Sequence, residues 1–84
     1  MPTKIAVLGA GSWGTVLANL LTENGHEVDL WSHNPDQVAL MKRTHQNEHY
    51  LGAEFTLQPA LHVTADLGQA LDQAAVILFV VPTN

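Results

Sequence analysis

The most constraining feature of the chain is the stretch Gly9-Ala10-Gly11-Ser12-Trp13-Gly14, whose glycines follow the spacing G-x-G-x-x-G. The residues before it, 4–8, form a short apolar and partly β-branched run, which is typical of a buried parallel strand. The apolar residues after it recur at helical spacing: Val16, Leu17, Leu20 and Leu21. The glycines are therefore predicted to lie in a strand-to-helix turn.

Each glycine has its own role in a turn of this kind. Gly9 allows the tight turn, Gly11 lets the backbone approach a pyrophosphate, and Gly14 lets the helix lie close to the strand. Ser12 is placed to cap the helix and to meet a phosphate. The helix adds free N–H groups and the positive end of its dipole. A dinucleotide site at this turn is therefore favoured over a glycine-rich turn with no ligand.

The rest of the chain continues the alternation of strands and helices. Strands are expected at 27–32, 61–64 and 75–81, the last being the clearest buried strand of the chain. The first helix is expected at 12–24 and ends at Gly25. The second is expected from 35 to 44 or 45. The third begins at about 67 and is capped by Thr64 or Asp66. Right-handed crossovers then give an α/β protein, a partial Rossmann fold with a parallel sheet of about four strands in the order 3-2-1-4. All of residues 1–84 are expected to belong to this one domain.

The start of the second helix has a distinct signature. Asn34 is predicted as its N-cap, Pro35 as its first residue, and Gln37 as the second arm of a capping box.

Composition excludes several classes of function. The net charge of −5 includes only three basic residues, so no electrostatic footprint for nucleic acid or an anionic membrane is expected. Cysteine is absent, which excludes disulfides and thiolate chemistry. No secretory signal is visible, and the longest apolar run, 74–81, is far shorter than the 20 or so residues of a membrane-spanning helix. These features predict a soluble, intracellular protein.

The end of the second strand bears on cofactor choice. An acid that binds the adenosine ribose normally stands there, about 20 residues beyond the glycines. The sequence has Ser32, His33 and Asn34 at that position, while Asp29 lies inside the strand. All three can donate a hydrogen bond to a 2′-phosphate, so NADP is favoured over NAD. The alternative for His33 is a solvated loop histidine.

Two further groups of residues have open roles. Trp13 either covers a cofactor or packs on the sheet edge, whereas Trp31 is expected in the core. His45 and His49 have metal-ligand spacing with Glu48 between them, but the order is not H-E-x-x-H, so no metal site is predicted.

Longer blocks of sequence carry a resemblance to a known family. They are Gly9 to Thr15, Leu30 to Pro35, Asn47 to Leu51, Asp66-Leu67 and Val80 to Pro82. Together they resemble the bacterial NAD(P)-dependent glycerol-3-phosphate dehydrogenases over essentially the whole chain. The resemblance implies a cytoplasmic enzyme of glycerophospholipid synthesis that interconverts dihydroxyacetone phosphate and sn-glycerol 3-phosphate. It also implies that Ser12, Trp13, His33 and Tyr50 contact NADP.

The resemblance has two departures. Gly52 follows Leu51 where the family usually has proline. The family's catalytic lysines and substrate-binding residues lie beyond residue 84, so no catalytic residue is assigned and the 84-residue chain alone is expected to be inactive. Its ending after the last strand resembles a cut, and an exposed apolar last strand predicts self-association.

Two other functions remain open at this point. One is another Rossmann reductase, similar to ketopantoate reductase or to sugar-nucleotide dehydrogenases. The other is a non-enzymatic dinucleotide-sensing module, which needs only the glycine turn and a ribose acid.

Overall fold

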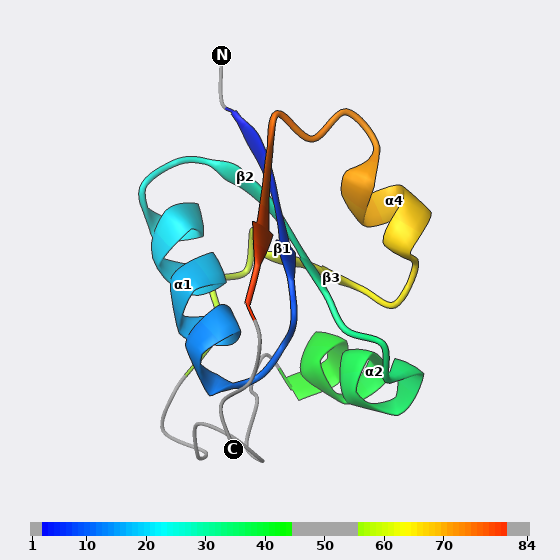
Figure 1. The fold of residues 1–84 in the computed structure, drawn as a ribbon. Helices are drawn as coiled ribbons and strands as arrows, with labels where there is room; N and C mark the ends of the chain where they lie inside the picture. Colours follow the sequence, from blue (N-terminus) through cyan, green and yellow to red (C-terminus); the bar gives the residue numbers. More distant parts are fainter. Residues whose placement is uncertain (1–2, 45–55, 81–84) are drawn as a thin grey trace.

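The computed structural model describes residues 3–44 and 56–80, which form a parallel sheet with helices on both faces (Figure 1). Its elements in chain order are β1 (Lys4–Leu8), α1 (Ser12–Glu23), β2 (Glu27–Trp31), α2 (Pro35–Thr44), β3 (His62–Thr64), α4 (Leu67–Leu71) and β4 (Val76–Phe79). The strand order is β3-β2-β1-β4, and every pairing is parallel. Both the α/β class and the predicted order 3-2-1-4 are confirmed.

The two faces of the sheet hold separate apolar cores because successive strand residues point to opposite sides. On one face, Val7 and Leu30 are fully buried against α1 and α2, which contribute Ala18, Val38 and Met41. On the other face, Ala6 and Leu8 pack with Ala70 of α4. The central strands β1 and β2 are thus covered on both sides. This leaves their carboxyl ends, where α1 and α2 begin, as the edge at which a ligand of such a fold binds.

Sequence signals at the helix ends work largely as predicted. Gly25 follows α1 with φ of +91°, and Asn34 caps α2 by accepting the N–H groups of Asp36 (3.0 Å) and Gln37 (3.3 Å). Asp66, and not Thr64, is the N-cap of α4. The prediction of Gln37 as the second arm of the capping box was wrong, because the N–H of Asn34 donates to the hydroxyl of Ser32 at 3.2 Å.

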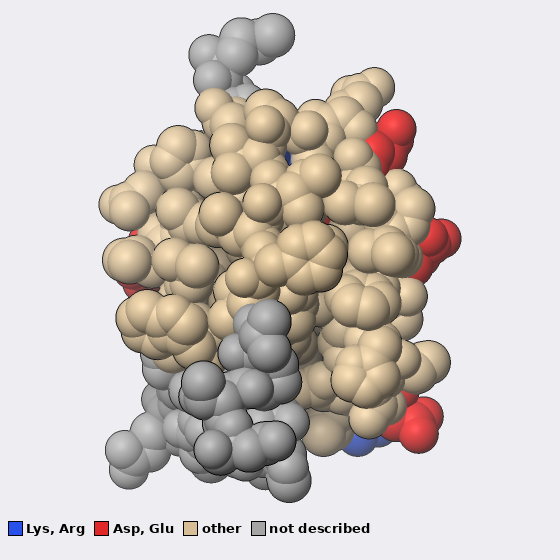
Figure 2. Space-filling model, viewed as in Figure 1, with Lys and Arg blue, Asp and Glu red and all other residues tan. Residues whose placement is uncertain are grey.

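β4 is not the buried strand that its composition indicates. It pairs with β1 on one side and forms an edge of the described sheet. Ile77 is 48% exposed and Phe79 is 78% exposed, since no described element packs over them. The face that carries β4 shows no charged side chain over the strand, and the acidic residues lie at its margins (Figure 2). Exposed apolar surface on this strand was also predicted, and that part is confirmed.

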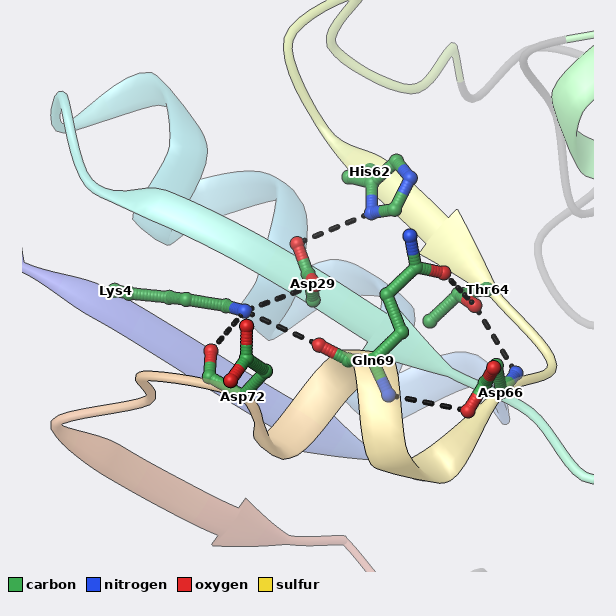
Figure 3. Close-up of polar contacts among 7 residues, drawn as sticks. All are labelled: Lys4, Asp29, His62, Thr64, Asp66, Gln69 and Asp72. Atoms are coloured by element: carbon green, nitrogen blue, oxygen red, sulfur yellow. Dashed lines mark hydrogen bonds and ion pairs between the residues drawn. The ribbon is translucent and has the colours of Figure 1, made fainter.

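A polar cluster explains how β2 accommodates an acid inside a sheet. Asp29 is 5% exposed; its carboxylate lies 3.5 Å from Lys4 Nζ and 3.2 Å from His62 Nδ1 (Figure 3). Lys4 also donates to the backbone carbonyls of Gln69, at 3.2 Å, and Asp72. The ammonium group therefore joins β1 and β2 to the C-terminal end of α4.

The described helices are all short: none combines the length and apolar character needed to cross a bilayer.

Candidate functional site

The glycine turn joins the buried end of β1 to the start of α1. Gly9 has φ of +126°, which side-chain-bearing residues rarely adopt, and a Cβ there would lie 2.3 Å from the carbonyl oxygen of Val80. A Cβ on Gly14 would lie 2.0 Å from the carbonyl oxygen of Gly9. The predicted roles of these two glycines are therefore confirmed: one permits the turn, and the other lets α1 approach it.

The first turn of α1 has the donors that a phosphate needs. Its first helical hydrogen bond is from Thr15 N–H to the Gly11 carbonyl, at 3.0 Å, so the preceding amides have no partner within the helix. The N-cap is Gly11, which has no side chain to occupy those amides. Ser12 is the first residue of the helix, so its prediction as the cap was wrong. The arrangement fits a pyrophosphate at this end of the helix.

Thr15 is a member of this turn that the sequence prediction did not single out. It is completely buried, and its hydroxyl donates to the Gly11 carbonyl at 2.7 Å. This bond holds the Gly11 carbonyl oxygen so that it points away from the amide groups of the first turn of α1. A threonine directly after the last glycine was the available signal.

Trp13 projects from the start of α1 with 69% of its surface exposed. Packing on the sheet edge is therefore wrong, and covering a bound cofactor stays a prediction. Trp31 behaves as expected of a core residue: it packs beside Ala6 and Leu8, and its indole N–H donates to the Ala65 carbonyl at 3.1 Å.

The loop between β2 and α2 lies beside the glycine turn. Leu8 pairs with Trp31 at the ends of β1 and β2, and the N–H of Gly9 donates to the Trp31 carbonyl at 3.0 Å. Residues 32–34 therefore start at the same edge as the phosphate-binding turn. The structure brings together Gly9, Gly11, Ser12, Trp13, Gly14, His33 and Asn34 at this edge.

The three loop residues differ in what they can offer a ligand. Ser32 is 3% exposed and its hydroxyl donates to Gln37 Oε1 at 2.6 Å, so it is not free to bind a 2′-phosphate as the sequence suggested. His33 is exposed, with its ring 6.4 Å from that of Trp31. Asn34 is exposed and uses its amide oxygen to cap α2. Recognition by side chains at this loop is thus limited to His33 and the amide nitrogen of Asn34.

Asp29 is excluded as a ribose-binding acid. It pairs with Ala6 and His62 in the middle of the sheet, and its carboxylate is bound to Lys4. Tyr50, and the histidines 45 and 49, lie outside the described residues. Within the two described segments, no three potential metal ligands are grouped together.

Comparison with known proteins agrees with this geometry. A profile of the NAD-dependent glycerol-3-phosphate dehydrogenase N-terminus matches residues 4–84. Glycerol-3-phosphate dehydrogenase [NAD(P)+] of Lactiplantibacillus plantarum is 57% identical over the whole chain, and that of Latilactobacillus sakei is 54% identical. The chain spans 25% and 24% of these two relatives. The crystal structure of glycerol-3-phosphate dehydrogenase from Coxiella burnetii aligns with a TM-score of 0.88 and 41% identity, over 96% of this chain and 25% of that one.

Neither of the two alternative functions gains support over this family from the comparisons. The chain belongs to the NAD-dependent glycerol-3-phosphate dehydrogenase family, and it matches the N-terminal, dinucleotide-binding region of that family.

Proposed function

We propose that this chain binds the adenosine and pyrophosphate part of NAD(P). The observation that carries the proposal is the glycine turn, where the uncapped start of α1 lies beside the loop that follows β2. Amides at a helix N-terminus bind phosphate because they are free donors at the positive end of the helix dipole. A neighbouring loop is then placed to contact the ribose of the same ligand.

Residues of the site divide between the two ends of this ligand. Gly11, Ser12 and Gly14 hold the pyrophosphate through the backbone, and Trp13 covers the cofactor with its exposed ring. His33 and Asn34 contact the adenosine ribose and donate to its 2′-phosphate, which makes NADP the preferred cofactor over NAD. Tyr50 adds a contact by family resemblance. The missing acid at the end of β2 supports the preference, since a carboxylate there would repel the 2′-phosphate.

The reaction proposed for the whole protein follows from its family. When bound, NAD(P)H would supply the hydride that reduces the C2 carbonyl of dihydroxyacetone phosphate, with a proton added to the oxygen, to give sn-glycerol 3-phosphate; this reaction feeds glycerophospholipid synthesis in the cytoplasm. The residues of this chain bind and orient the cofactor. None of them is assigned to catalysis, so the 84-residue chain alone is expected to bind without turnover.

Fluorescence titration of the chain with NADPH and NADH tests the proposal. Binding is read from energy transfer between tryptophan and the reduced nicotinamide, and turnover from absorbance after addition of dihydroxyacetone phosphate. We expect saturable binding of both, tighter for NADPH, with no turnover. If the chain binds neither NADPH nor NADH, the proposal is overturned. Turnover of dihydroxyacetone phosphate by this chain would overturn the assignment of catalysis to residues outside it.

A further inference from the structure

A chain of hydrogen bonds crosses the candidate site between the β2–α2 loop and the glycine turn. The N–H of Asn34 donates to Ser32 Oγ at 3.2 Å, and that hydroxyl donates to Gln37 Oε1 at 2.6 Å. Gln37 Nε2 then donates to the carbonyl oxygen of Ala10 at 3.0 Å. Ala10 stands between the first two glycines of the turn. One side chain thus connects both halves of the site.

The chemistry of these groups allows only one direction for the chain of bonds. The Ala10 carbonyl only accepts, so it requires the amide nitrogen of Gln37. The amide oxygen then faces Ser32, which must donate its proton and receive the Asn34 N–H on a lone pair. Each member therefore orients the next. A carboxylate in place of the Gln37 amide would set an oxygen against the Ala10 carbonyl, and an apolar side chain would break both bonds.

The turn after β3 repeats the local part of this arrangement without the bridge. There, the N–H of Asp66 donates to Thr64 Oγ1 at 3.0 Å, and that hydroxyl donates to Gln69 Oε1 at 2.9 Å (Figure 3). The spacing of hydroxyl, N-cap and glutamine is the same in both turns. Within the described residues, the amide nitrogen of Gln69 makes no hydrogen bond to the glycine turn. The local motif serves helix capping, and the bond to Ala10 is what distinguishes Gln37.

We propose that Gln37 is a positioning residue that sets the β2–α2 loop, with His33 and Asn34, at a fixed distance from the glycine turn and thereby determines discrimination between NADP and NAD. The inference rests on the proposed function. Gln37 lies in the first turn of α2 and acts through the loop, because its amide is already bonded to Ser32 and Ala10. A 2′-phosphate is recognised only if the loop donors lie at the correct span from the pyrophosphate, so loss of the bridge lowers affinity most for the ligand that carries this group.

The test compares Gln37→Met with Gln69→Met in the full chain. Both variants remove a glutamine amide from the same local motif, but only the first breaks the bridge. Dissociation constants are measured for NADPH, NADH and inorganic pyrophosphate, the last as a probe of the glycine turn alone. The ratio of the NADPH and NADH constants is independent of the folded fraction, so simple destabilisation does not change it.

We expect Gln37→Met to weaken NADPH binding by about tenfold, which corresponds to the loss of one hydrogen bond between the loop and the 2′-phosphate. NADH binding should change less, and pyrophosphate binding should be unaffected. Gln69→Met should leave all three constants and the ratio unchanged. Gln37→Glu, which keeps an acceptor for Ser32, should likewise raise the ratio of the NADPH dissociation constant to that of NADH, and it serves if the methionine variant folds poorly. An unchanged ratio in a Gln37 variant of a protein that binds both nucleotides overturns this inference and leaves the proposed function intact. Failure of the unsubstituted protein to bind either nucleotide overturns both.

Discussion

Replacing the buried acid of β2 by its amide, Asp29→Asn, should destabilise the fold strongly without altering cofactor choice. The side chain of Asp29 is 7% exposed and that of its partner Lys4 is 16% exposed, with 3.5 Å between the charged groups. Asparagine keeps the volume but leaves the ammonium group without its counter-ion. Lys4 retains the carbonyls of Gln69 and Asp72 as acceptors.

The magnitude follows from the geometry of this pair. At 3.5 Å the attraction of two unit charges is about 5 kcal/mol for an effective dielectric constant near 20, before desolvation is subtracted. Removing one partner of a buried pair typically costs about 3–5 kcal/mol. The remaining acceptors of Lys4 place the cost at the lower end, about 3 kcal/mol. In a domain of this size that lowers the melting temperature by more than about 10 °C.

Urea unfolding followed by far-ultraviolet circular dichroism measures this free energy. The matched control is Glu27→Gln, since Glu27 lies two residues earlier on the same face of β2 but is exposed; it should change stability by less than about 0.5 kcal/mol. Adding Lys4→Met to Asp29→Asn should cost less than the sum of the single changes, because the charges are coupled. Equal, small losses of unfolding free energy in Asp29→Asn and Glu27→Gln would show that the buried ion pair does not stabilise the fold. A changed ratio of the NADPH and NADH dissociation constants in Asp29→Asn would show that this pair influences cofactor choice.

Three further substitutions test the helix approach at Gly14, the role of Trp13 and the exposed strand β4. Gly14→Ala should lower the free energy of unfolding by more than about 2 kcal/mol, because its Cβ would meet the Gly9 carbonyl oxygen at 2.0 Å. The control Gly68→Ala meets only a side-chain oxygen at 3.3 Å and should be nearly neutral. Similar melting temperatures for the two variants would contradict the close approach of α1. Trp13→Ala should weaken NADPH binding while leaving the urea midpoint unchanged, since the ring is 69% exposed; unaltered binding would remove Trp13 from the site. Phe79→Lys should reduce self-association in sedimentation velocity relative to the exposed control Leu40→Lys, and identical sedimentation of both variants would exclude β4 as the contact.

Most of the fold could be predicted because local signals agreed with one another. The glycine spacing, the apolar run before it and the cap at Asn34 each specify a βα unit, and right-handed crossovers then fix the order β3-β2-β1-β4. The burial of β4 could not be predicted this way. Its run of Val76 to Phe79 is apolar throughout, yet burial depends on which element packs over the strand, and local sequence does not specify that.

The site was predicted less completely because its polar contacts join distant parts of the chain. Gln37 has the correct spacing for a capping box, but its amide bonds to Ala10, which lies 27 positions earlier. Ser32 was expected to face a ligand, but it is buried and its hydroxyl donates to the amide oxygen of Gln37. A signal for the Lys4–Asp29 pair was present: Lys4 is the single charge of β1, and Asp29 stands between the apolar residues Val28 and Leu30 of β2. Charges buried in this way are almost always paired.

Binding of the cofactor at the glycine turn and the β2–α2 loop is tested most directly by mapping NADPH onto the chain through amide chemical-shift changes in a nitrogen-labelled sample. We expect the largest changes at residues 9–14 and 32–34, with NADH producing smaller changes in the second group. Changes concentrated on α4 or β4, or the absence of saturable changes at the glycine turn, would contradict binding at this site.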